Sequence, residues 1–374
     1  MLIVAALILA YWLTRLFRLD HFPIFSDEGI YIHWAKTAWH DATWRFISLT
    51  DGRQPFQTWA TIPFLKLFPD NLLIGGRLFA VFAGFMGFVG MMTLCAYLYG
   101  RKPAYFAGLL MVATPYFFFY DRLALADSAV TAGTIWMLFL AFLLARTRRM
   151  DVALTLGIVT GLTMLTKSSI RLYAGLFYST SLLIFFPAKA MKAHLISLIG
   201  KSTKGIRSSW AQLADFTVLY GVAMVIALVL YNVQRLSPFF HFVSQKNATF
   251  ILTTQELLAN PLEVFPVNLY RVPLYLTWEL GFIVMVFAVC GYYLLLKKKD
   301  GPALVLFLIT LASYVLIALV ARVLFPRYIM AVAAFLVIPA AYFLSRLKKR
   351  CFSPGDDCLC HLHGALVIHY LFPT

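Results

Sequence analysis

The chain has 374 residues, of which 61% are hydrophobic and only 13% are charged, and its mean hydropathy is +0.81. A soluble domain of this length cannot bury so much apolar surface in one core, so the surplus must face lipid. The 32 Lys and Arg residues outnumber the 16 Asp and Glu residues and give a net charge of +16. The composition therefore predicts an all-α polytopic membrane protein and excludes an ordinary soluble domain.

Long apolar runs recur from one end of the sequence to the other. Because a bilayer core needs roughly 20 mostly apolar residues per helix, we expect about ten transmembrane helices. Their approximate bounds, in chain order, are residues 2–17, 78–98, 103–119, 128–145, 152–165, 172–187, 216–231, 274–296, 302–321 and 329–345. The first run has no preceding basic residue and no small-residue cleavage site, so we expect a retained anchor rather than a secretory signal.

The basic residues indicate the orientation, since Lys and Arg accumulate in loops on the cytoplasmic side. If both termini are cytoplasmic, more than half of the 32 basic residues fall in cytoplasmic loops or at the closing end. These loops hold Arg101, Lys102, Arg146, Arg148, Arg149, Lys189, Lys192, Lys201, Lys204, Arg207, Lys297, Lys298, Lys299, Arg346, Lys348, Lys349 and Arg350. The positive charge is therefore mainly a topology signal, with attraction to membrane lipid, and we expect no nucleic-acid partner.

Most of the 16 acidic residues fall on the opposite, outer side in this topology. The first outer loop, about residues 18–77, is too long for a simple turn and is rich in Trp and Phe. Aromatic rings favour the headgroup level of a bilayer, so we expect helices that lie on the membrane surface in this loop.

The stretch FSDEGIYIHW places Asp27 and Glu28 directly after the first apolar run. Ser26 is a candidate N-cap, which would put both carboxylates in the first turn of a helix running to about Trp39. Unpaired N–H groups at a helix start favour negative charge, so both should be ionised at neutral pH. Such carboxylates can act as a base, bind a divalent cation or orient a hydroxyl group, and helix capping alone is the simpler alternative.

A charged stretch follows in the second outer loop. YDRLALADS, residues 120–128, holds Asp121, Arg122 and Asp127 between two spans. Charges at the edge of a membrane are costly enough to suggest a site, although a structural ion pair is the alternative.

Cations then appear on the same face, where they have no topological reason to be. LTKSSIRL contributes Lys167 and Arg171, and FPRYIM contributes Arg327 and Tyr328. The convergence of acids and cations on one membrane face predicts a site for an anionic, lipid-borne substrate.

Taken in order, these motifs resemble a known family. The DE pair is followed by DGRQPFQTW (51–59), GGRLFAVFAG (75–84), YDRLALAD, LTK and finally PRY. This order is similar to that of the GT-C glycosyltransferases of the protein mannosyltransferase and lipid A aminoarabinose transferase type, the glycosyltransferase family 39-like enzymes. The resemblance covers residues 20–172 well and the rest of the chain loosely.

The resemblance implies a GT-C-like bundle that transfers a sugar by inverting single displacement. The donor would be a polyprenyl-phosphate-linked sugar, and the acceptor a lipid, glycan or protein on the extracytoplasmic face. By the same resemblance, Asp27 would activate or orient the acceptor hydroxyl, and Glu28 would support it or help hold a divalent cation. Asp127 matches the second-loop acid, and Lys167 and Arg327 match cations near the lipid phosphate.

One departure from the family pattern lies in the first outer loop. Many relatives have a Lys-Pro-Pro turn where this chain reads RQPF at residues 53–56. Either Arg53 replaces that lysine, since arginine can grip a phosphate bidentately, or this donor contact is missing. Arg122, Arg171 and Tyr328 complete the set of residues expected near the donor phosphate.

We divide the chain into a membrane domain, residues 1–346, and a cytoplasmic tail, residues 347–374. The tail breaks in composition from everything before it, and we expect it to be disordered or aberrant. Its Cys358 and His361 belong to a Cys/His group whose spacing matches no standard zinc finger.

A membrane transporter or a lipid-linked sugar flippase is the alternative function, because it would also be basic and polytopic. Transporters commonly place charges near the midplane and often contain internal repeats. Here the charges gather at one face and no repeat is seen, which favours an enzyme.

Two further features have simple interpretations. Gly84, Gly157 and Gly161 are expected at places where helices pack closely. Asn247 begins an Asn-Ala-Thr glycosylation sequon in a predicted outer loop, a tripeptide that also arises by chance.

Overall fold

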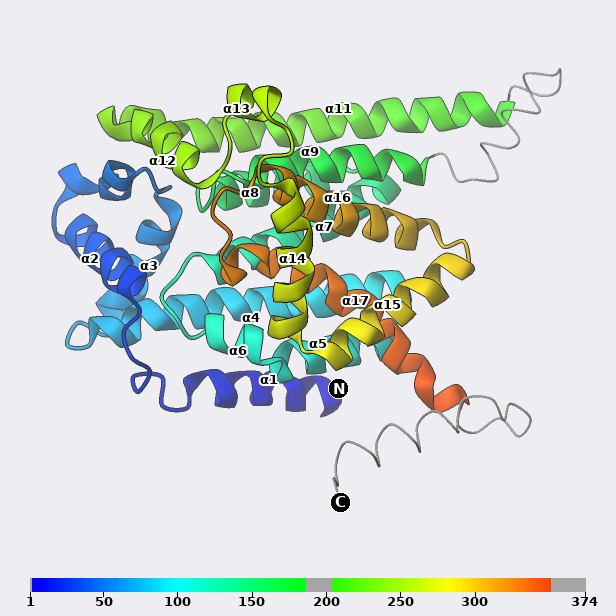
Figure 1. Cartoon of the computed structure of the whole chain (residues 1–374), viewed down its shortest axis with the longest axis horizontal. Coiled ribbons are helices and arrows are strands. Elements are labelled where there is room, and N and C mark those ends of the chain that lie inside the picture. Colours follow the sequence, from blue (N-terminus) through cyan, green and yellow to red (C-terminus); the bar gives the residue numbers. More distant parts are fainter. Residues whose placement is uncertain (1, 186–203, 351–374) are drawn as a thin grey trace.

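The computed structural model describes residues 2–185 and 204–350, and over these residues the chain is helical and forms no β-strand. Figure 1 shows long helices that run side by side, with short helices gathered at one end. The predicted all-α fold class is confirmed. The tail from residue 351, with its cysteines and histidines, lies outside the described residues.

The bounds of the elements follow in chain order. The α-helices are α1 (Leu2–Leu16), α2 (Ser26–His40), α3 (Phe56–Leu67), α4 (Leu72–Tyr99), α5 (Arg101–Ala113), α6 (Pro115–Tyr120), α7 (Asp127–Thr147), α8 (Met150–Met164), α9 (Ile170–Ser181), α11 (Lys204–Asn232), α12 (Phe242–Phe250), α13 (Thr254–Ala259), α14 (Phe265–Leu280), α15 (Phe282–Lys297), α16 (Gly301–Val320) and α17 (Met330–Arg350). The 3-10 helices are η1 (Ala42–Trp44), η2 (Ile47–Asp51), η3 (Leu182–Ile184), η4 (Val233–Leu236), η5 (Pro238–His241) and η6 (Pro326–Ile329).

The bundle contains helices of membrane-spanning length. Among the described residues, five helices are long and apolar enough to cross a membrane: Leu72–Tyr99, Asp127–Thr147, Trp210–Leu236, Gly301–Val320 and Pro326–Leu347. Shorter apolar helices occupy other predicted spans, namely Leu2–Leu16, Met150–Met164 and Ile170–Ile184. The chain is therefore a multi-pass membrane protein, while the count of about ten spans stays a prediction.

Two predicted spans are not continuous helices. The run 103–119 breaks before Pro115, which starts α6, because a proline ring disfavours helical geometry in the preceding residue, Thr114. The run 274–296 is not one straight helix, because α14 and α15 are bent by 111° relative to each other. Gly281 lies at the bend with φ of 84°, a left-handed value that only glycine adopts at little cost.

Close helix packing is confirmed at the glycines. A Cβ on Gly157 would meet the backbone of Ala223, and one on Gly161 would meet the side chain of Leu230, both on α11. A Cβ on Gly84 would meet Asp121. Small residues let membrane helices approach closely, so these positions fix how α8 packs against α11 and how α4 packs against the loop before α7.

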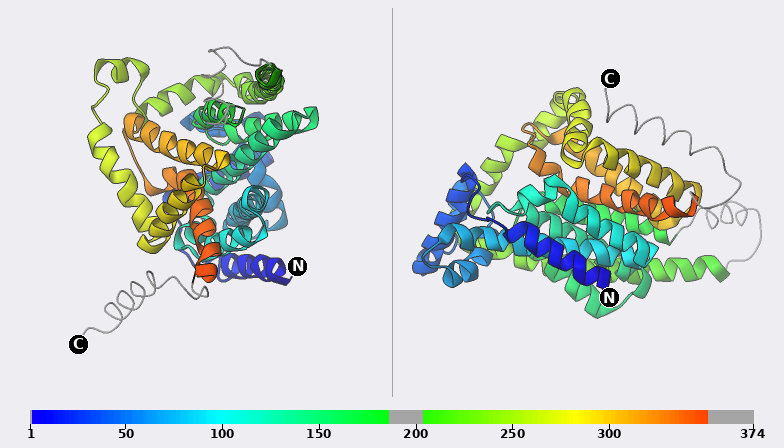
Figure 2. Two further views of the ribbon diagram at one scale, coloured as in Figure 1. Left: turned by 90° about the vertical axis from the view of Figure 1, so that its right-hand side faces the viewer. Right: turned by 90° about the horizontal axis from the view of Figure 1, so that it is seen from below.

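The first loop folds into short helices, as predicted. Helices α2 and α3 are joined by η1 and η2, and we call residues 26–67 the end cap. Figures 1 and 2 place the end cap against one end of the bundle. The N-cap prediction is off by one residue, because α2 begins at Ser26 and Phe25 occupies the N-cap position.

A fully buried ion pair anchors the end cap to the bundle. The Glu28 and Arg77 side chains both have 0% exposure, and Arg77 Nε and Nη2 donate to the two carboxylate oxygens at 2.9 and 2.8 Å. Glu28 also accepts from the backbone N–H groups of Phe25 and Ala124. Arg77 donates to backbone carbonyls in segment 19–23. One pair therefore joins α2, α4 and the loop before α7.

The charges at the start of the second outer loop are also structural. Asp121 lies 3.6 Å from the Arg15 Nε atom of α1 and accepts a hydrogen bond from the Tyr11 hydroxyl. Arg122 donates to the backbone carbonyls of residues 17 and 18. Both side chains are buried, so they hold α1 and the chain that follows it against the bundle.

Removing the Glu28 carboxylate should destabilise the protein strongly. We expect Glu28→Ala to lower the free energy of unfolding by about 3 kcal/mol or more, because Arg77 would be left as an unpaired buried charge. The measurement is thermal unfolding of the purified protein in detergent. The matched control is Glu256→Ala, since Glu256 also lies in a first helical turn and pairs with an arginine, Arg322, but is solvent-exposed. Equal loss of stability in the two variants would contradict the prediction.

Candidate active site

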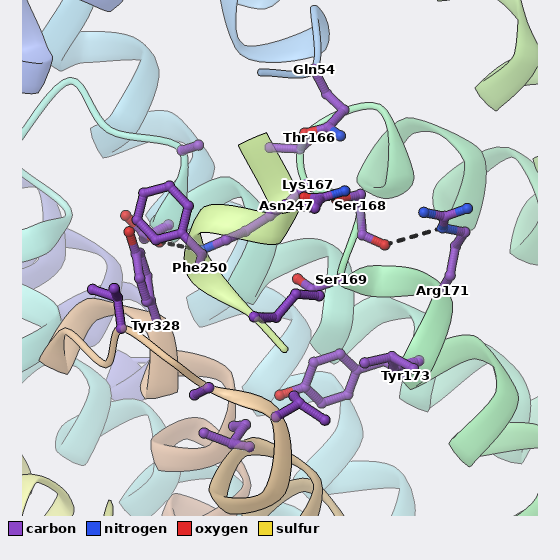
Figure 3. Close-up of a pocket in the computed structure, with 18 of the residues that line it drawn as sticks. Gln54, Thr166, Lys167, Ser168, Ser169, Arg171, Tyr173, Asn247, Phe250 and Tyr328 are labelled. Atoms are coloured by element: carbon purple, nitrogen blue, oxygen red, sulfur yellow. Dashed lines mark hydrogen bonds and ion pairs between the residues drawn. The ribbon is translucent and has the colours of Figure 1, made fainter. Parts of the chain in front are cut away.

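A cavity of about 410 Å³ lies between the end cap and the bundle (Figure 3). Segments far apart in the sequence supply its polar walls, among them residues 52–54 of the end cap, the start of α7, residues 166–169 between α8 and α9, helix α12, and η6. The backbone N–H of Phe56 donates to the Leu165 carbonyl at 3.0 Å, which ties the end cap to the α8–α9 connection. The cavity is therefore assembled from elements that this packing brings together.

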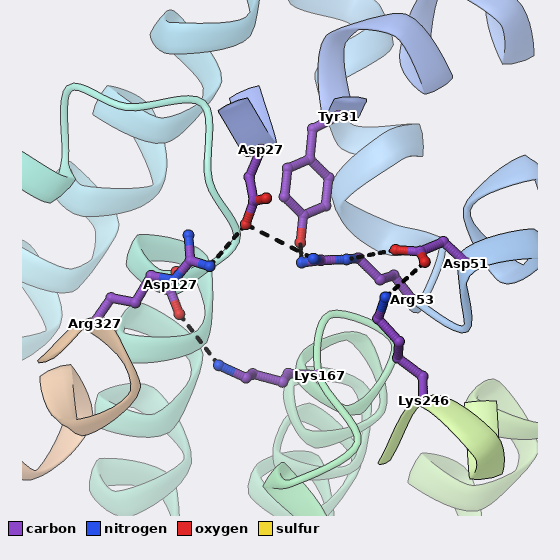
Figure 4. A network of polar contacts seen from close by, with 8 residues as sticks. All are labelled: Asp27, Tyr31, Asp51, Arg53, Asp127, Lys167, Lys246 and Arg327. Carbon is purple, nitrogen blue, oxygen red and sulfur yellow. Dashed lines mark hydrogen bonds and ion pairs between the residues drawn. The ribbon is translucent and has the colours of Figure 1, made fainter. Parts of the chain in front are cut away.

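Asp27 faces two arginines at the polar end of the site (Figure 4). Arg327 Nη2 donates to Asp27 Oδ2 at 2.7 Å, and Arg53 Nη2 lies 3.7 Å from the same oxygen. Both contacts use Oδ2. The other carboxylate oxygen, Oδ1, has no hydrogen-bond partner among the described residues, so it can accept a hydroxyl group of a ligand.

Asp127 also contacts two cations, Lys167 and the same Arg327 that contacts Asp27. It lies in the first turn of α7, 3.2 Å from Lys167 Nζ and 4.0 Å from Arg327 Nε. The Lys167 ammonium group also lies over the ring of Tyr328, 4.1 Å from its centroid. Arg327 thus bridges the two carboxylates Asp27 and Asp127.

Sequence reasoning missed a third ion pair beside the cavity, formed by Asp51 and Lys246. Lys246 Nζ donates to Asp51 Oδ1 at 2.6 Å, and Arg53 Nε contacts Asp51 Oδ2 at 3.1 Å. Gly52 lets α12 approach η2 this closely, because a Cβ there would meet the Phe242 carbonyl oxygen and the Lys246 side chain. Lys246 is a cation on the predicted outer side, so the argument that selected Lys167 could also have selected it.

Tyr31 completes the polar wall. Its hydroxyl accepts a hydrogen bond of 2.8 Å from Arg53 Nη1. Burial raises the pKa of Tyr31 to about 12, although nearby Arg53 opposes this shift. The phenol therefore stays protonated at neutral pH and can donate a hydrogen bond.

The other half of the cavity is apolar. Its walls come from α9, α16 and the chain after α16, and include Leu172, Leu176, Leu316, Ile317, Val320 and Leu324. Arg171 lies at this half with its guanidinium carbon 5.1 Å from the centroid of the Tyr231 ring. One continuous cavity thus has a charged end and a hydrocarbon-like end.

Most of the expected site residues come together here. Arg53, Asp127, Lys167, Arg171, Arg327 and Tyr328 line the cavity, and Asp27 is joined to it through Arg327 and Arg53. Glu28 and Arg122 do not line it. Arg122 is engaged with backbone carbonyls and packs over the rings of Phe22 and Phe118.

Glu28 does not fit the divalent-cation site considered for the DE pair. Each of its oxygens already accepts two hydrogen bonds, one from Arg77 and one from a backbone N–H. In the described parts of the chain, no three His, Cys, Asp or Glu side chains are grouped so as to hold a metal ion.

The comparisons with known proteins concern the family and the fold. The sequence model of the dolichyl-phosphate-mannose-protein mannosyltransferase family matches residues 53–227. The fold is similar to the crystal structure of ArnT from Cupriavidus metallidurans bound to undecaprenyl phosphate, with a TM-score of 0.67 and 19% sequence identity. That match covers 98% of this chain and 62% of ArnT.

The chain has the GT-C glycosyltransferase fold. A second similar structure is the archaeal oligosaccharyltransferase AglB from Archaeoglobus fulgidus in complex with an inhibitory peptide and a dolichol-phosphate. Its TM-score is 0.59 at 14% identity, over 100% of this chain and 52% of AglB. This GT-C chain thus spans about three fifths of ArnT and half of AglB. No curated protein matches its sequence.

The family match and the two structures confirm the predicted resemblance to GT-C glycosyltransferases of the protein mannosyltransferase and aminoarabinose transferase type. The matched segment 53–227 contains Arg53, Asp127 and Lys167 and ends before Arg327.

Proposed function

We propose that this protein transfers a sugar from a polyprenyl-phosphate donor to a lipid, glycan or protein acceptor on the extracytoplasmic face of the membrane. The observation that carries the proposal is the single cavity with a charged end and an apolar end. A polyprenyl phosphate has the same two parts, because an anionic headgroup is joined to a hydrocarbon chain.

The balance of charge in the cavity supports an anionic headgroup. Five basic side chains line it, namely Arg53, Lys167, Arg171, Lys246 and Arg327, with Asp127 as the lining carboxylate. Arginine and lysine are the usual partners of phosphate, arginine through its planar fork and lysine as a point charge. The solved structures of similar fold contain undecaprenyl phosphate and dolichol-phosphate, which are lipid phosphates of this kind.

The proposed reaction is a single displacement at the anomeric carbon of the sugar. An acceptor hydroxyl placed at Asp27 Oδ1 gives its proton to the carboxylate as its oxygen forms a bond to the anomeric carbon. The bond between that carbon and the phosphate oxygen breaks at the same time, and the polyprenyl phosphate leaves with the electron pair. Attack from the side opposite the phosphate inverts the anomeric centre.

The leaving phosphate gains negative charge in the transition state, and cations already in place stabilise it. Lys167 and Arg327 line the cavity, and ion pairs with Asp127 hold both side chains before any donor binds. Charges oriented in advance need little reorganisation during the reaction, which is the main source of electrostatic catalysis.

The proposed face and orientation can be tested by cysteine labelling. Starting from a variant without the five native cysteines, Thr43→Cys and Asp70→Cys should react with an impermeant reagent applied from outside the cell. Lys299→Cys should react only after the membrane is permeabilised. All three positions are exposed, so access to the reagent depends on the side of the membrane. Reversed labelling would place the cavity on the cytoplasmic side and contradict the proposal.

Asp27→Asn should lower turnover by about 10² or more, the usual scale for losing a general base. The amide keeps the size of the side chain, and Arg327 keeps Asp127 as a partner at 4.0 Å, so the variant should still fold and bind the donor lipid. The measurement is transfer from a polyprenyl-phosphate sugar by purified protein, with Asp20→Asn, an exposed acid outside the cavity, as the control. Full activity of Asp27→Asn would remove this residue from the mechanism.

Lys167→Met should weaken donor binding by about 10-fold or more, since a hydrogen bond to a charged group contributes roughly 1.5–3 kcal/mol. The matched control is Lys36→Met, which changes an exposed lysine of α2 away from the cavity. Binding of undecaprenyl phosphate can be followed by native mass spectrometry. If the lipid binds both variants equally, Lys167 is not a phosphate contact. If wild-type protein binds the lipid but never transfers a sugar, a transporter or flippase of lipid-linked sugars becomes the better explanation.

A further inference from the structure

One wall of the cavity carries a buried side chain that the charge network does not use. Gln54 lines the cavity and is only 6% exposed, and its amide nitrogen has no hydrogen-bond partner among the described residues. Leaving a buried amide unpaired is costly, so such a group in a cavity wall indicates a polar ligand.

The position of Gln54 is determined by the same packing that forms the cavity. It lies between Arg53, which faces Asp27, and Pro55, the residue before α3. The hydrogen bond from the Phe56 N–H to the Leu165 carbonyl holds this turn against the next connection. In Figure 3 the Gln54 side chain points toward the loop that contains Thr166 and Lys167. Its amide is therefore directed to the charged end of the cavity rather than to the apolar end.

A second amide lies in the cavity wall on α12. Asn247 Oδ1 accepts a hydrogen bond of 2.9 Å from the Ser168 hydroxyl. This bond fixes the orientation of the side chain and directs its amide nitrogen away from Ser168. Asn247 follows Lys246 in sequence, and both line the cavity. The sequon asparagine is thus a wall residue of the candidate active site.

We propose that Gln54 and Asn247 form a subsite that recognises hydroxyl groups of the sugar carried by the donor, and that this sugar is uncharged. The proposal rests on the proposed function, since it concerns the headgroup of the same lipid. Carboxamides suit this role because each offers donors and an acceptor, as a sugar hydroxyl does, without adding charge. A site that hydrogen-bonds a hydroxyl discriminates against ligands that lack it, because its own polar groups are then left unpaired.

The charges around the subsite disfavour an amino sugar. An ammonium group would need a carboxylate partner, and the nearby acids already have cations: Asp27 with Arg327, Asp51 with Lys246, and Asp127 with Lys167. The Oδ1 atom of Asp27 is taken by the acceptor hydroxyl in the proposed reaction. The five cations that line the cavity would also repel a positively charged sugar. The donor phosphate would pair with the cations, and the uncharged amides of Gln54 and Asn247 would form hydrogen bonds with the sugar ring.

The test compares two lipids that differ only in the sugar. Binding of undecaprenyl phosphate and of undecaprenyl phosphate carrying a neutral hexose is measured for wild type, Gln54→Leu and Asn247→Leu. Each variant should bind the hexose lipid about 3- to 10-fold more weakly, the scale of one neutral hydrogen bond, while the bare lipid binds within a factor of about two of wild type. Gln255→Leu, on exposed α13, is the matched control and should change neither affinity.

A third lipid tests the charge of the sugar. Undecaprenyl phosphate carrying the corresponding amino sugar should bind wild-type protein more weakly than the hexose lipid. Tighter binding of the amino-sugar lipid would overturn the inference.

The outcomes separate this inference from the proposed function. If wild-type protein does not bind bare undecaprenyl phosphate, the donor class is wrong and the subsite fails with it. If the bare lipid binds well but both variants lose affinity for the two lipids equally, or lose none, the amides do not recognise the sugar. Should Gln54→Leu fail to fold, Gln54→Asn keeps the carboxamide on a shorter side chain. This variant should also lose affinity for the hexose lipid but not for the bare lipid.

Discussion

The buried pair between Glu28 and Arg77 is the interaction on which the site depends. Successive residues on an α-helix point about 100° apart, so a side chain fixed in the interior determines where its neighbour points. Because Glu28 is held by Arg77 and by the Ala124 N–H, Asp27 is directed toward Arg327 and the cavity. Two adjacent carboxylates thus have separate tasks, one structural and one at the site.

The paired acids keep a cluster of cations stable in a small cavity. Several cations gathered in a small cavity repel one another when no anion is bound, and unpaired charges at low dielectric are unstable. Asp27, Asp51 and Asp127 each hold cations in place, so the cluster can persist in the free protein. The apolar half of the cavity needs no such arrangement, because its walls carry no charge.

The sequence was enough to predict an all-α membrane bundle, helices in the first loop, and the gathering of Asp27, Asp127, Lys167 and Arg327 at one end. Those predictions rest on hydropathy and on the side of the membrane, which a sequence encodes directly. The sequence did not reveal that the Glu28 side chain points into the protein. Its direction is determined by its ion pair with Arg77, which lies 49 residues further along the chain. The bend at Gly281 was missed for a similar reason, since an apolar run looks the same whether straight or folded back.

The salt bridge between Asp27 and Arg327 joins residues 300 positions apart. A ribosome that adds 5–20 residues per second needs roughly 15–60 s to travel this distance. During that time Asp27 has been made, but Arg327, which donates a hydrogen bond to it, has not. The charged end of the cavity is therefore completed only after η6 has been made, and a nascent chain halted before residue 327 would lack the arginine that bridges its two carboxylates.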